Sequence, residues 1–143
     1  MIKKVVTLII LSNSSVILQL RDDKSHISYP GKWGYFSGSL NKGENCHYAA
    51  ARECREELGI NSIKKIKFQF TYFQSNTKTL FYVFTIVPNL KKIVLKEGLD
   101  YDFFFYNDFV KGFKFSKKRK KIFKIAEDEV MMRFYNKLSL TIK

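Results

Sequence analysis

Three glutamates at helical spacing are the residues of this chain whose types and intervals are best suited to chemistry. Glu56 and Glu57 follow Glu53 by three and four positions, so on a helix the three carboxylates emerge on one face. Two such charges about 6 Å apart repel by roughly 3 kcal/mol at an effective dielectric near 20. An ion pair such as Arg52 with Glu56 stabilises the helix by only about 0.3–0.5 kcal/mol. The repulsion within the cluster therefore exceeds what such a pair contributes, and the cluster is unfavourable for stability.

A bound divalent cation reverses this argument, because the carboxylates become ligands instead of repelling neighbours. Magnesium takes oxygen ligands and keeps room for waters and phosphate oxygens, so it suits this set best. The alternative ligands are Cys46 and Cys54, which lie eight residues apart, with His26 and His47 as the only histidines. A zinc site is disfavoured, and a buried inert thiol is the preferred interpretation of Cys54.

A helix from about Asn45 to Leu58 is predicted to position the glutamates. Ala50, Cys54 and Leu58 recur every four residues and predict one buried stripe. Gly59 then supplies the C-terminal stop. With the stripe packed on a sheet, the carboxylates are held toward a cleft.

The segments around this helix predict a sheet. Val5 to Leu11 and Val16 to Arg21 read as two strands joined by a tight turn. "IKFQFTYFQ" and "TLFYVFTIV" predict a hairpin around "SNTK", and "YDFFFYNDF" predicts a short strand that leads into a turn. The predicted fold class is therefore α+β, a mixed sheet with helices packed on it.

Two further segments complete this prediction. Arg21 to Gly34 carries a Pro-Gly pair and charges, so it predicts an ordered surface loop. From about Lys117 to Leu138 apolar residues such as Ile122 and Val130 recur at helical intervals, which predicts a long amphipathic helix.

Length and charge set broad limits. The 143 residues predict a single domain over residues 1–143, and no apolar run approaches the roughly 20 residues that span a bilayer. The expected compartment is the cytoplasm, and homodimerisation stays open. The net charge of +13 is typical of a protein that binds a polyanion such as nucleic acid. For the dense basic run Lys114 to Lys124, a solvated helix face is favoured over a nucleic-acid patch.

The acidic stretch carries a family resemblance. Gly38 is followed after five residues by Glu44 and, seven residues later, by "RECREELGI" from Arg52 to Ile60. This series fits the motif G-x5-E-x7-R-E-U-x-E-E-x-G-U, where U is apolar, so the chain resembles the Nudix hydrolase family. "LQLRDD", "YPGKWGYFSG" and "KEG" also look like segments of small single-domain members.

The resemblance implies a Nudix-type α/β/α sandwich with a mixed β-sheet. It implies hydrolysis of a nucleoside diphosphate linked to another group, such as a (d)NTP or a nucleotide sugar, with Mg²⁺ or Mn²⁺. By position in the motif, Glu53, Glu56 and Glu57 coordinate the metal, while Arg52 and Glu44 orient these carboxylates.

Other positions follow from the same resemblance. The backbone carbonyl of Ser37 is implied as a metal ligand, and Glu97 in "KEG" as a ligand or general base. Asp100 and Asp102 lie close by in sequence and remain alternatives to Glu97. Gly38 is assigned to the substrate site.

Substrate contacts are less determined by the sequence. Arg21 suits phosphate binding or plain solvent exposure equally. Four aromatic residues could stack on a base, although a core position is favoured for them; they are Trp33, Tyr35, Phe36 and Tyr82.

Three functions remain in competition. The first is an active pyrophosphohydrolase, which the complete set of acidic positions favours. The second is a non-catalytic Nudix domain that binds a nucleotide or RNA. The third is a nucleic-acid-processing role, such as action on a 5′ phosphorylated RNA end, which requires Lys117 to Lys121 to border the active cleft.

Overall fold

The computed structural model describes residues 1–24, 27, 29–61, 65–89, 91, 93–95 and 98–138. These residues divide into two compact units, each of which is described by itself. Unit 1 takes the described residues of Met1–Ile10 and Phe36–Lys96, and unit 2 takes those of Leu11–Tyr35 and Glu97–Lys143.

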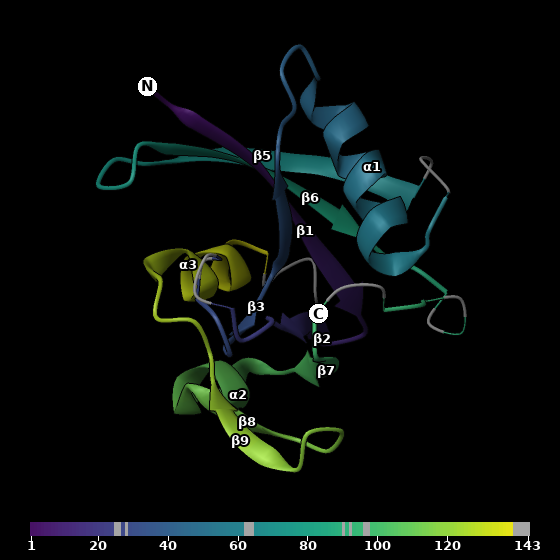
Figure 1. The fold of residues 1–143 in the computed structure, drawn as a ribbon, viewed down its shortest axis with the longest axis vertical. Helices are drawn as coiled ribbons and strands as arrows, with labels where there is room; N and C mark the ends of the chain where they lie inside the picture. Colours follow the sequence, from purple (N-terminus) through teal and green to yellow (C-terminus); the bar gives the residue numbers. More distant parts are fainter. Residues whose placement is uncertain are drawn as a thin grey trace. The chain divides into compact units, whose positions relative to one another are not determined.

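Unit 1 is a mixed sheet that carries one helix. Its elements are β1 (Lys3–Ser12, whose last two residues belong to unit 2), β4 (Phe36–Ser39), α1 (Cys46–Leu58), β5 (Ile66–Gln74) and β6 (Thr79–Ile86). One edge of β1 pairs parallel with β6 and the other edge pairs antiparallel with β4, while β5 pairs antiparallel with β6. Helix α1 contacts β4 and β5 (Figure 1).

The core of unit 1 forms where α1 meets the sheet. Ala50, Cys54 and Leu58 are all buried, which confirms the predicted stripe. The His47 ring packs edge-on against Phe84 of β6, with 5.3 Å between the ring centroids. Strand β1 is buried continuously from Val5 to Leu11, as expected for a strand with side chains covered on both faces.

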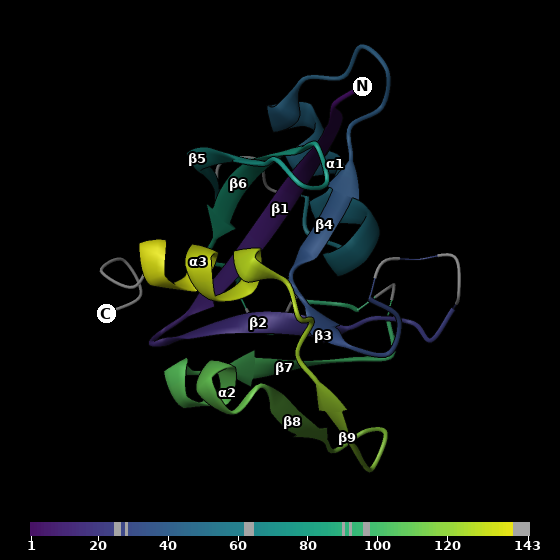
Figure 2. The same ribbon diagram turned by 90° about the vertical axis from the view of Figure 1, so that its left-hand side faces the viewer.

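Unit 2 is built around strand β2. Its elements are β2 (Ser15–Leu20), β3 (Trp33–Gly34), β7 (Asp100–Phe104), α2 (Tyr106–Lys111), β8 (Phe113–Ser116), β9 (Lys121–Lys124) and α3 (Glu129–Lys137). β3 and β7 both pair antiparallel with β2. β8 and β9 form a separate two-stranded hairpin, and α2 lies beside β7 and β8 (Figure 2).

Several predicted elements are confirmed. The two N-terminal strands, the α1 helix and the β5–β6 hairpin occur where the sequence predicts them, within a few residues. The tight turn between β1 and β2 has Asn13 at a φ of 53°, a conformation that asparagine tolerates better than most residues. The predicted fold class, α+β with a mixed sheet, is confirmed.

The predicted C-terminal helix is wrong over its first half. Phe113–Ser116 and Lys121–Lys124 form the β8–β9 hairpin, and α3 begins only at Glu129. Strand pairing and tertiary hydrogen bonds explain the difference, because β9 pairs with β8 and the backbone N–H of Ala126 donates to the Trp33 carbonyl. These bonds hold the segment extended in spite of its helical periodicity.

Two smaller predictions also differ from the structure. Trp33–Gly34, assigned to a surface loop, forms the short strand β3, because the fully buried Trp33 packs edge-on against Phe104. Tyr106–Lys111, assigned to a turn, forms the helix α2. Asp108 at the third helical position accepts a hydrogen bond from the Phe105 backbone N–H, which stabilises the helix start. Among the described residues, no helix is long and apolar enough to cross a bilayer.

Candidate active site

The ends of α1 are fixed by local chemistry. Asn45 caps the N-terminus, because its side-chain oxygen accepts a hydrogen bond from the Tyr48 N–H at 2.9 Å. At the other end Gly59 adopts the left-handed conformation, with φ 67°, and its N–H donates to the Arg55 carbonyl at 3.1 Å. The glutamates of the motif therefore lie on a helix with both ends defined.

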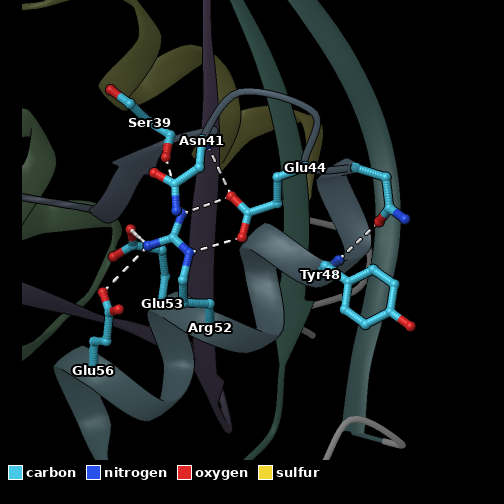
Figure 3. Close-up of polar contacts among 8 residues, drawn as sticks. Ser39, Asn41, Glu44, Tyr48, Arg52, Glu53 and Glu56 are labelled. Carbon is cyan, nitrogen blue, oxygen red and sulfur yellow. Dashed lines mark hydrogen bonds and ion pairs between the residues drawn. The ribbon is translucent and has the colours of Figure 1, made fainter.

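Arg52 is the centre of the site (Figure 3). Its guanidinium donates to both oxygens of Glu44, at 2.8 and 2.9 Å. Its Nη1 donates to Glu53 Oε1 at 2.8 Å and to Glu56 Oε2 at 3.2 Å, and its Nη2 donates to the Ser39 carbonyl at 3.0 Å. One guanidinium thus links three carboxylates and the end of β4. We call these five residues the Arg52 network.

The network has a clear electrostatic consequence. Hydrogen bonds from Arg52 and from the Asn41 backbone N–H lower the pKa of Glu44 to about 2. The pKa of Arg52 is raised, mainly by its hydrogen bonds to Glu44. Both groups therefore stay charged across the neutral pH range, and the bidentate pair is the strong, directional kind of ion pair.

Gly38 gives Glu53 its place. A Cβ atom at Gly38 would lie only 1.9 Å from Glu53 Oε1, a separation that no side chain could tolerate. Glu53 is 7% exposed, so its carboxylate fills a space against β4 that the glycine leaves open. The structure thus gives Gly38 a local packing role, and its assignment to the substrate site stays a prediction.

Glu57 and Cys54 occupy the buried side of α1. Glu57 is 3% exposed and Cys54 is 1% exposed. Burial, together with the charges of Glu57 and Glu53, raises the pKa of the Cys54 thiol to about 12. The interpretation of Cys54 as a buried inert thiol is therefore confirmed. Cys46 Sγ lies 3.6 Å from Nδ1 of its neighbour His47, and this single contact does not constitute a zinc site.

The three glutamates differ from one another in environment. Glu53 and Glu57 are buried, whereas the side chain of Glu56 is 51% exposed. Within the described part of the chain, no three acidic, histidine or cysteine side chains converge closely enough to form a metal-binding group. Glu53 and Glu56 are instead bridged by Arg52 Nη1.

The donor chemistry nevertheless fits a hard divalent cation. All the candidate side chains are carboxylates, the ligand type that Mg²⁺ and Mn²⁺ prefer. Two of them, Glu53 and Glu56, already face one shared positive group, the guanidinium nitrogen. Buried carboxylates are costly unless a cation compensates them, and at Glu53 the guanidinium of Arg52 is such a cation.

The remaining predicted site residues lie in different places. Ser37 and Gly38 are neighbours in β4, where Ser37 lies opposite Thr7 of β1. Arg21 belongs to unit 2, where its side chain passes Gly34. Asp100 accepts hydrogen bonds from Ser116 and from the Tyr101 N–H. The prediction for Glu97 lies outside the described residues.

The aromatic candidates are mainly core residues. Trp33, Tyr35 and Phe36 are buried, and Tyr82 is half-buried. Tyr35 also donates a hydrogen bond to the Met131 carbonyl at 2.6 Å, and burial raises its pKa. The core interpretation is confirmed for Trp33, Tyr35 and Phe36.

Sequence reasoning missed two contributors to the site. Asn41 donates its backbone N–H to Glu44 Oε1 at 2.9 Å, and the Ser39 carbonyl accepts from Arg52. The three-residue interval from Asn41 to Glu44 resembles that of a capping interaction and would have been a usable signal. No sequence pattern identifies a carbonyl acceptor such as that of Ser39.

The fold and the Arg52 network together define a small α+β protein with a carboxylate-rich helix. The family model for the NUDIX domain matches residues 1–129, and the chain belongs to this family. As a member, it is classed with hydrolases that act on acid anhydrides. No curated protein matches the chain.

Solved structures of the same fold include several similar proteins. The E. coli ORF135 protein has a TM-score of 0.68 and 15% identity, over 98% of this chain and 92% of that one. The MutT protein from Methanosarcina mazei Go1 has a TM-score of 0.66 and 19% identity, over 97% and 93%. An Ap4A hydrolase from C. elegans has a TM-score of 0.64 and 19% identity, over 99% and 98%. The chain spans only 44% of a MutT/nudix family protein from Enterococcus faecalis, at a TM-score of 0.61 and 15% identity.

Proposed function

We propose that this chain is a Mg²⁺-dependent hydrolase that cleaves a diphosphate bond in a nucleoside diphosphate linked to another group, such as a (d)NTP or a nucleotide sugar. The observation that carries the proposal is the Arg52 network, in which one guanidinium gathers three carboxylates of the motif. Several carboxylates at fixed geometry form the kind of oxygen donor set that a hard divalent cation requires.

Mg²⁺, or Mn²⁺ in its place, would be held by Glu53, Glu56 and Glu57, with the Ser37 carbonyl and Glu97 as further ligands. When bound, such a cation neutralises the diphosphate and lowers the pKa of a water molecule for in-line attack on phosphorus.

Arg52 and Glu44 would position the carboxylates without contacting the reacting atoms. Because Glu44 accepts from both Nε and Nη2 of the guanidinium, Arg52 would stay anchored if Glu53 and Glu56 bound a cation in place of its Nη1. Glu44 remains ionised at neutral pH and so keeps Arg52 in place. Removing such an orienting residue typically costs 10–100-fold in metal affinity or activity.

A carboxylate must also accept the proton of the attacking water. Glu97 is the proposed base, with Asp100 and Asp102 as alternatives. The Asp100 carboxylate already accepts two hydrogen bonds and that of Asp102 accepts one, from the Phe103 N–H. Both carboxylates are thus already engaged within unit 2, which weakens the case for either aspartate as base.

Other parts of the prediction remain proposals. We propose that residues 1–143 form one domain, which the match of a single family model to residues of both units supports. Arg21 is proposed to meet substrate phosphate, and Gly38 to shape the substrate site through β4. A cytoplasmic location stays a prediction.

The test of this function is the variant Glu57→Gln, which keeps the shape of the side chain and removes its charge. We expect it to abolish Mg²⁺-dependent hydrolysis while the metal-free melting temperature stays equal or rises, because the change removes one of three like charges at helical spacing. The matched control is Glu129→Gln in the first turn of α3, which should keep full activity. A large loss of metal-free stability in Glu57→Gln would show that the carboxylate is structural.

To identify the substrate, the protein is assayed with Mg²⁺ and with Mn²⁺ against a panel of nucleoside triphosphates, nucleotide sugars, dinucleoside polyphosphates and capped RNA. Release of nucleoside monophosphate or phosphate from at least one of them is the expected result. Binding of a nucleotide without any turnover across the panel would instead identify a non-catalytic nucleotide-binding domain.

A further inference from the structure

The β8–β9 hairpin has two unlike faces. In the register of the hairpin, Phe113 lies opposite Lys124 and Phe115 lies opposite Ile122. Because side chains alternate along a strand, these four residues share one face. Phe113, Phe115 and Ile122 are 45%, 50% and 57% exposed, so this face offers apolar surface to solvent. We call these four residues the aromatic face.

The opposite face of the hairpin is fixed to unit 2. Lys114 Nζ donates to the Phe103 carbonyl and pairs with Asp108, while Ser116 Oγ donates to Asp100 at 2.6 Å. The Trp33 indole N–H donates to the Lys114 carbonyl at 3.2 Å. The hairpin is thus held firmly through one face, which leaves the aromatic face available to a partner.

The turn of the hairpin concentrates positive charge. Residues Lys117 to Lys121 are five consecutive cations, all exposed, and no acidic residue occurs between Lys111 and Ala126. None of these five side chains takes part in a salt bridge within the described part of the chain. The positive charge is therefore available to an external anion.

A hollow of about 370 Å³ adjoins the aromatic face. Phe113 and Lys124 belong to both, so the two surfaces are continuous. Buried Ile125 and Met131 supply apolar lining, while Lys111 and Glu127 supply charged groups at the same hollow. Apolar walls with a few polar groups suit a flat heterocycle that has hydrogen-bonding edges.

We infer that the aromatic face and basic turn of the β8–β9 hairpin bind a single-stranded polynucleotide, with bases against Phe113 and Phe115 and phosphates along Lys117 to Lys121. Side chains two residues apart on a strand lie about 6.8 Å from each other, which allows successive unstacked bases to contact both rings. The inference rests on unit 2 alone and is independent of the hydrolase activity proposed above.

Two other occupants fit the surface less well. A duplex keeps its bases stacked, so it would meet the lysines and leave the phenylalanine rings without a partner. An anionic membrane favours apolar residues at the tip of an inserting hairpin, but here the tip is the charged turn and the apolar residues lie on the strands. A single strand uses both the rings and the charges.

The experiment measures fluorescence anisotropy of labelled oligouridylate and oligothymidylate of about 12 nucleotides, without divalent metal, over a range of salt. We expect Phe115→Ala to weaken binding by about fivefold or more, as for the removal of one stacking platform. Its control is Phe73→Ala on β5 of unit 1, which is similarly exposed and should bind as wild type. Both substitutions lie on exposed sites, and circular dichroism checks that both variants fold.

The charge is tested with Lys118→Ala combined with Lys120→Ala. Each lysine that neutralises one phosphate of a single strand contributes about 0.7 to the slope of log K against log salt, so this variant should flatten the slope by about 1.4. The double variant Lys65→Ala with Lys67→Ala, on exposed positions of unit 1, is the control and should keep the wild-type slope.

Distinct outcomes would overturn the inference. Equal losses in the hairpin variants and their controls would show only a generally basic surface. Binding of a duplex as tightly as of the single strands, unaffected by Phe115→Ala, would remove the role of the rings. Binding to phosphatidylserine vesicles but to neither oligonucleotide would identify a membrane surface instead.

Discussion

The Arg52 network and the β8–β9 hairpin are both dense in charge, but they use it in opposite ways. In the network the positive and negative groups are adjacent and hydrogen-bonded to one another, with Arg52 donating to three carboxylates. In the turn of the hairpin five consecutive cations follow one another, with no acidic residue in the same segment. The first arrangement pairs opposite charges with one another, and the second contains cations alone.

This difference teaches how charge relates to function in this protein. A network of hydrogen-bonded opposite charges fixes geometry, because every oxygen that Arg52 binds loses freedom. A run of cations alone contributes little to the fold and serves association, because its field extends to outside ions and ligands. We therefore expect substitutions in the network to change stability and activity together, and substitutions in the basic turn to change binding with little effect on stability.

The largest effect is expected for Arg52→Ala. The Arg52 and Glu53 side chains are only 18% and 10% exposed, so the change deprives a nearly buried carboxylate of this cation. We expect a loss of about 3 kcal/mol in the free energy of unfolding and of about 10–100-fold in activity, measured by urea denaturation and by steady-state hydrolysis. Arg55→Ala, exposed on the same helix, should change stability by under about 1 kcal/mol. Similar losses in both variants would contradict a special role for Arg52.

A smaller effect is expected for Gly38→Ala. The new Cβ would meet the Glu53 carboxylate, which must move away from β4. We expect a loss of about 1–3 kcal/mol in the free energy of unfolding, together with weaker Mn²⁺ binding by calorimetry. At Gly34 a Cβ would lie at an ordinary 3.6 Å from Arg21, so Gly34→Ala is the control and should cost less. Unchanged Mn²⁺ affinity in Gly38→Ala would show that this glycine does not influence metal binding.

The pH dependence of stability should reflect Glu44. Its pKa in the folded protein is lowered to about 2 from an ordinary 4.5, so its contribution is present above about pH 4.5 and is lost as the pH falls toward 2. Wild type should therefore exceed Glu44→Gln in stability at pH 7, and this advantage should shrink between about pH 4.5 and pH 2 in urea denaturation. An advantage that stays constant over this range would show that Glu44 acts by packing and not by its charge.

The smallest effect is expected in the basic turn. Lys118→Gln relieves repulsion among neighbouring cations, so it should raise the free energy of unfolding by about 0.3 kcal/mol at low salt. The gain should vanish near 1 M salt, where charges are screened beyond about 3 Å. Thermal unfolding at both salt concentrations measures it. A clear loss of stability would reveal an internal partner for Lys118 and weaken the contrast with the Arg52 network.

The site was predictable largely because its determinants are local in sequence. Asn45, Gly59 and the four-residue interval of the buried stripe define α1 within one stretch of chain, and the observed helix begins and ends close to the predicted bounds. The family resemblance implied that Arg52 and Glu44 orient the other glutamates, but it did not predict that the two residues pair with each other. The bridge from Arg52 to Glu53 did not follow from spacing, because adjacent residues on a helix usually point apart.

The hairpin was not predictable from its own residues. Lysine-rich sequence with recurrent apolar positions favours a helix by both propensity and period. What holds the segment extended comes from distant positions, since Trp33 and Asp100 bind Lys114 and Ser116. For the same reason the sequence predicts a loop at Trp33 where the structure has a short strand, because the antiparallel partner of that strand, β2, is remote from it along the chain.

The most direct test of the central claim is Mn²⁺ binding followed by electron paramagnetic resonance, in which the signal of the free ion disappears as the ion binds. Wild-type protein should bind Mn²⁺, and added Mg²⁺ should compete with Mn²⁺ and release it. Glu57→Gln should bind much more weakly, and Glu129→Gln should bind as wild type. Equal Mn²⁺ uptake by wild type and Glu57→Gln, or no uptake by either, would contradict the account of α1 as a divalent metal site.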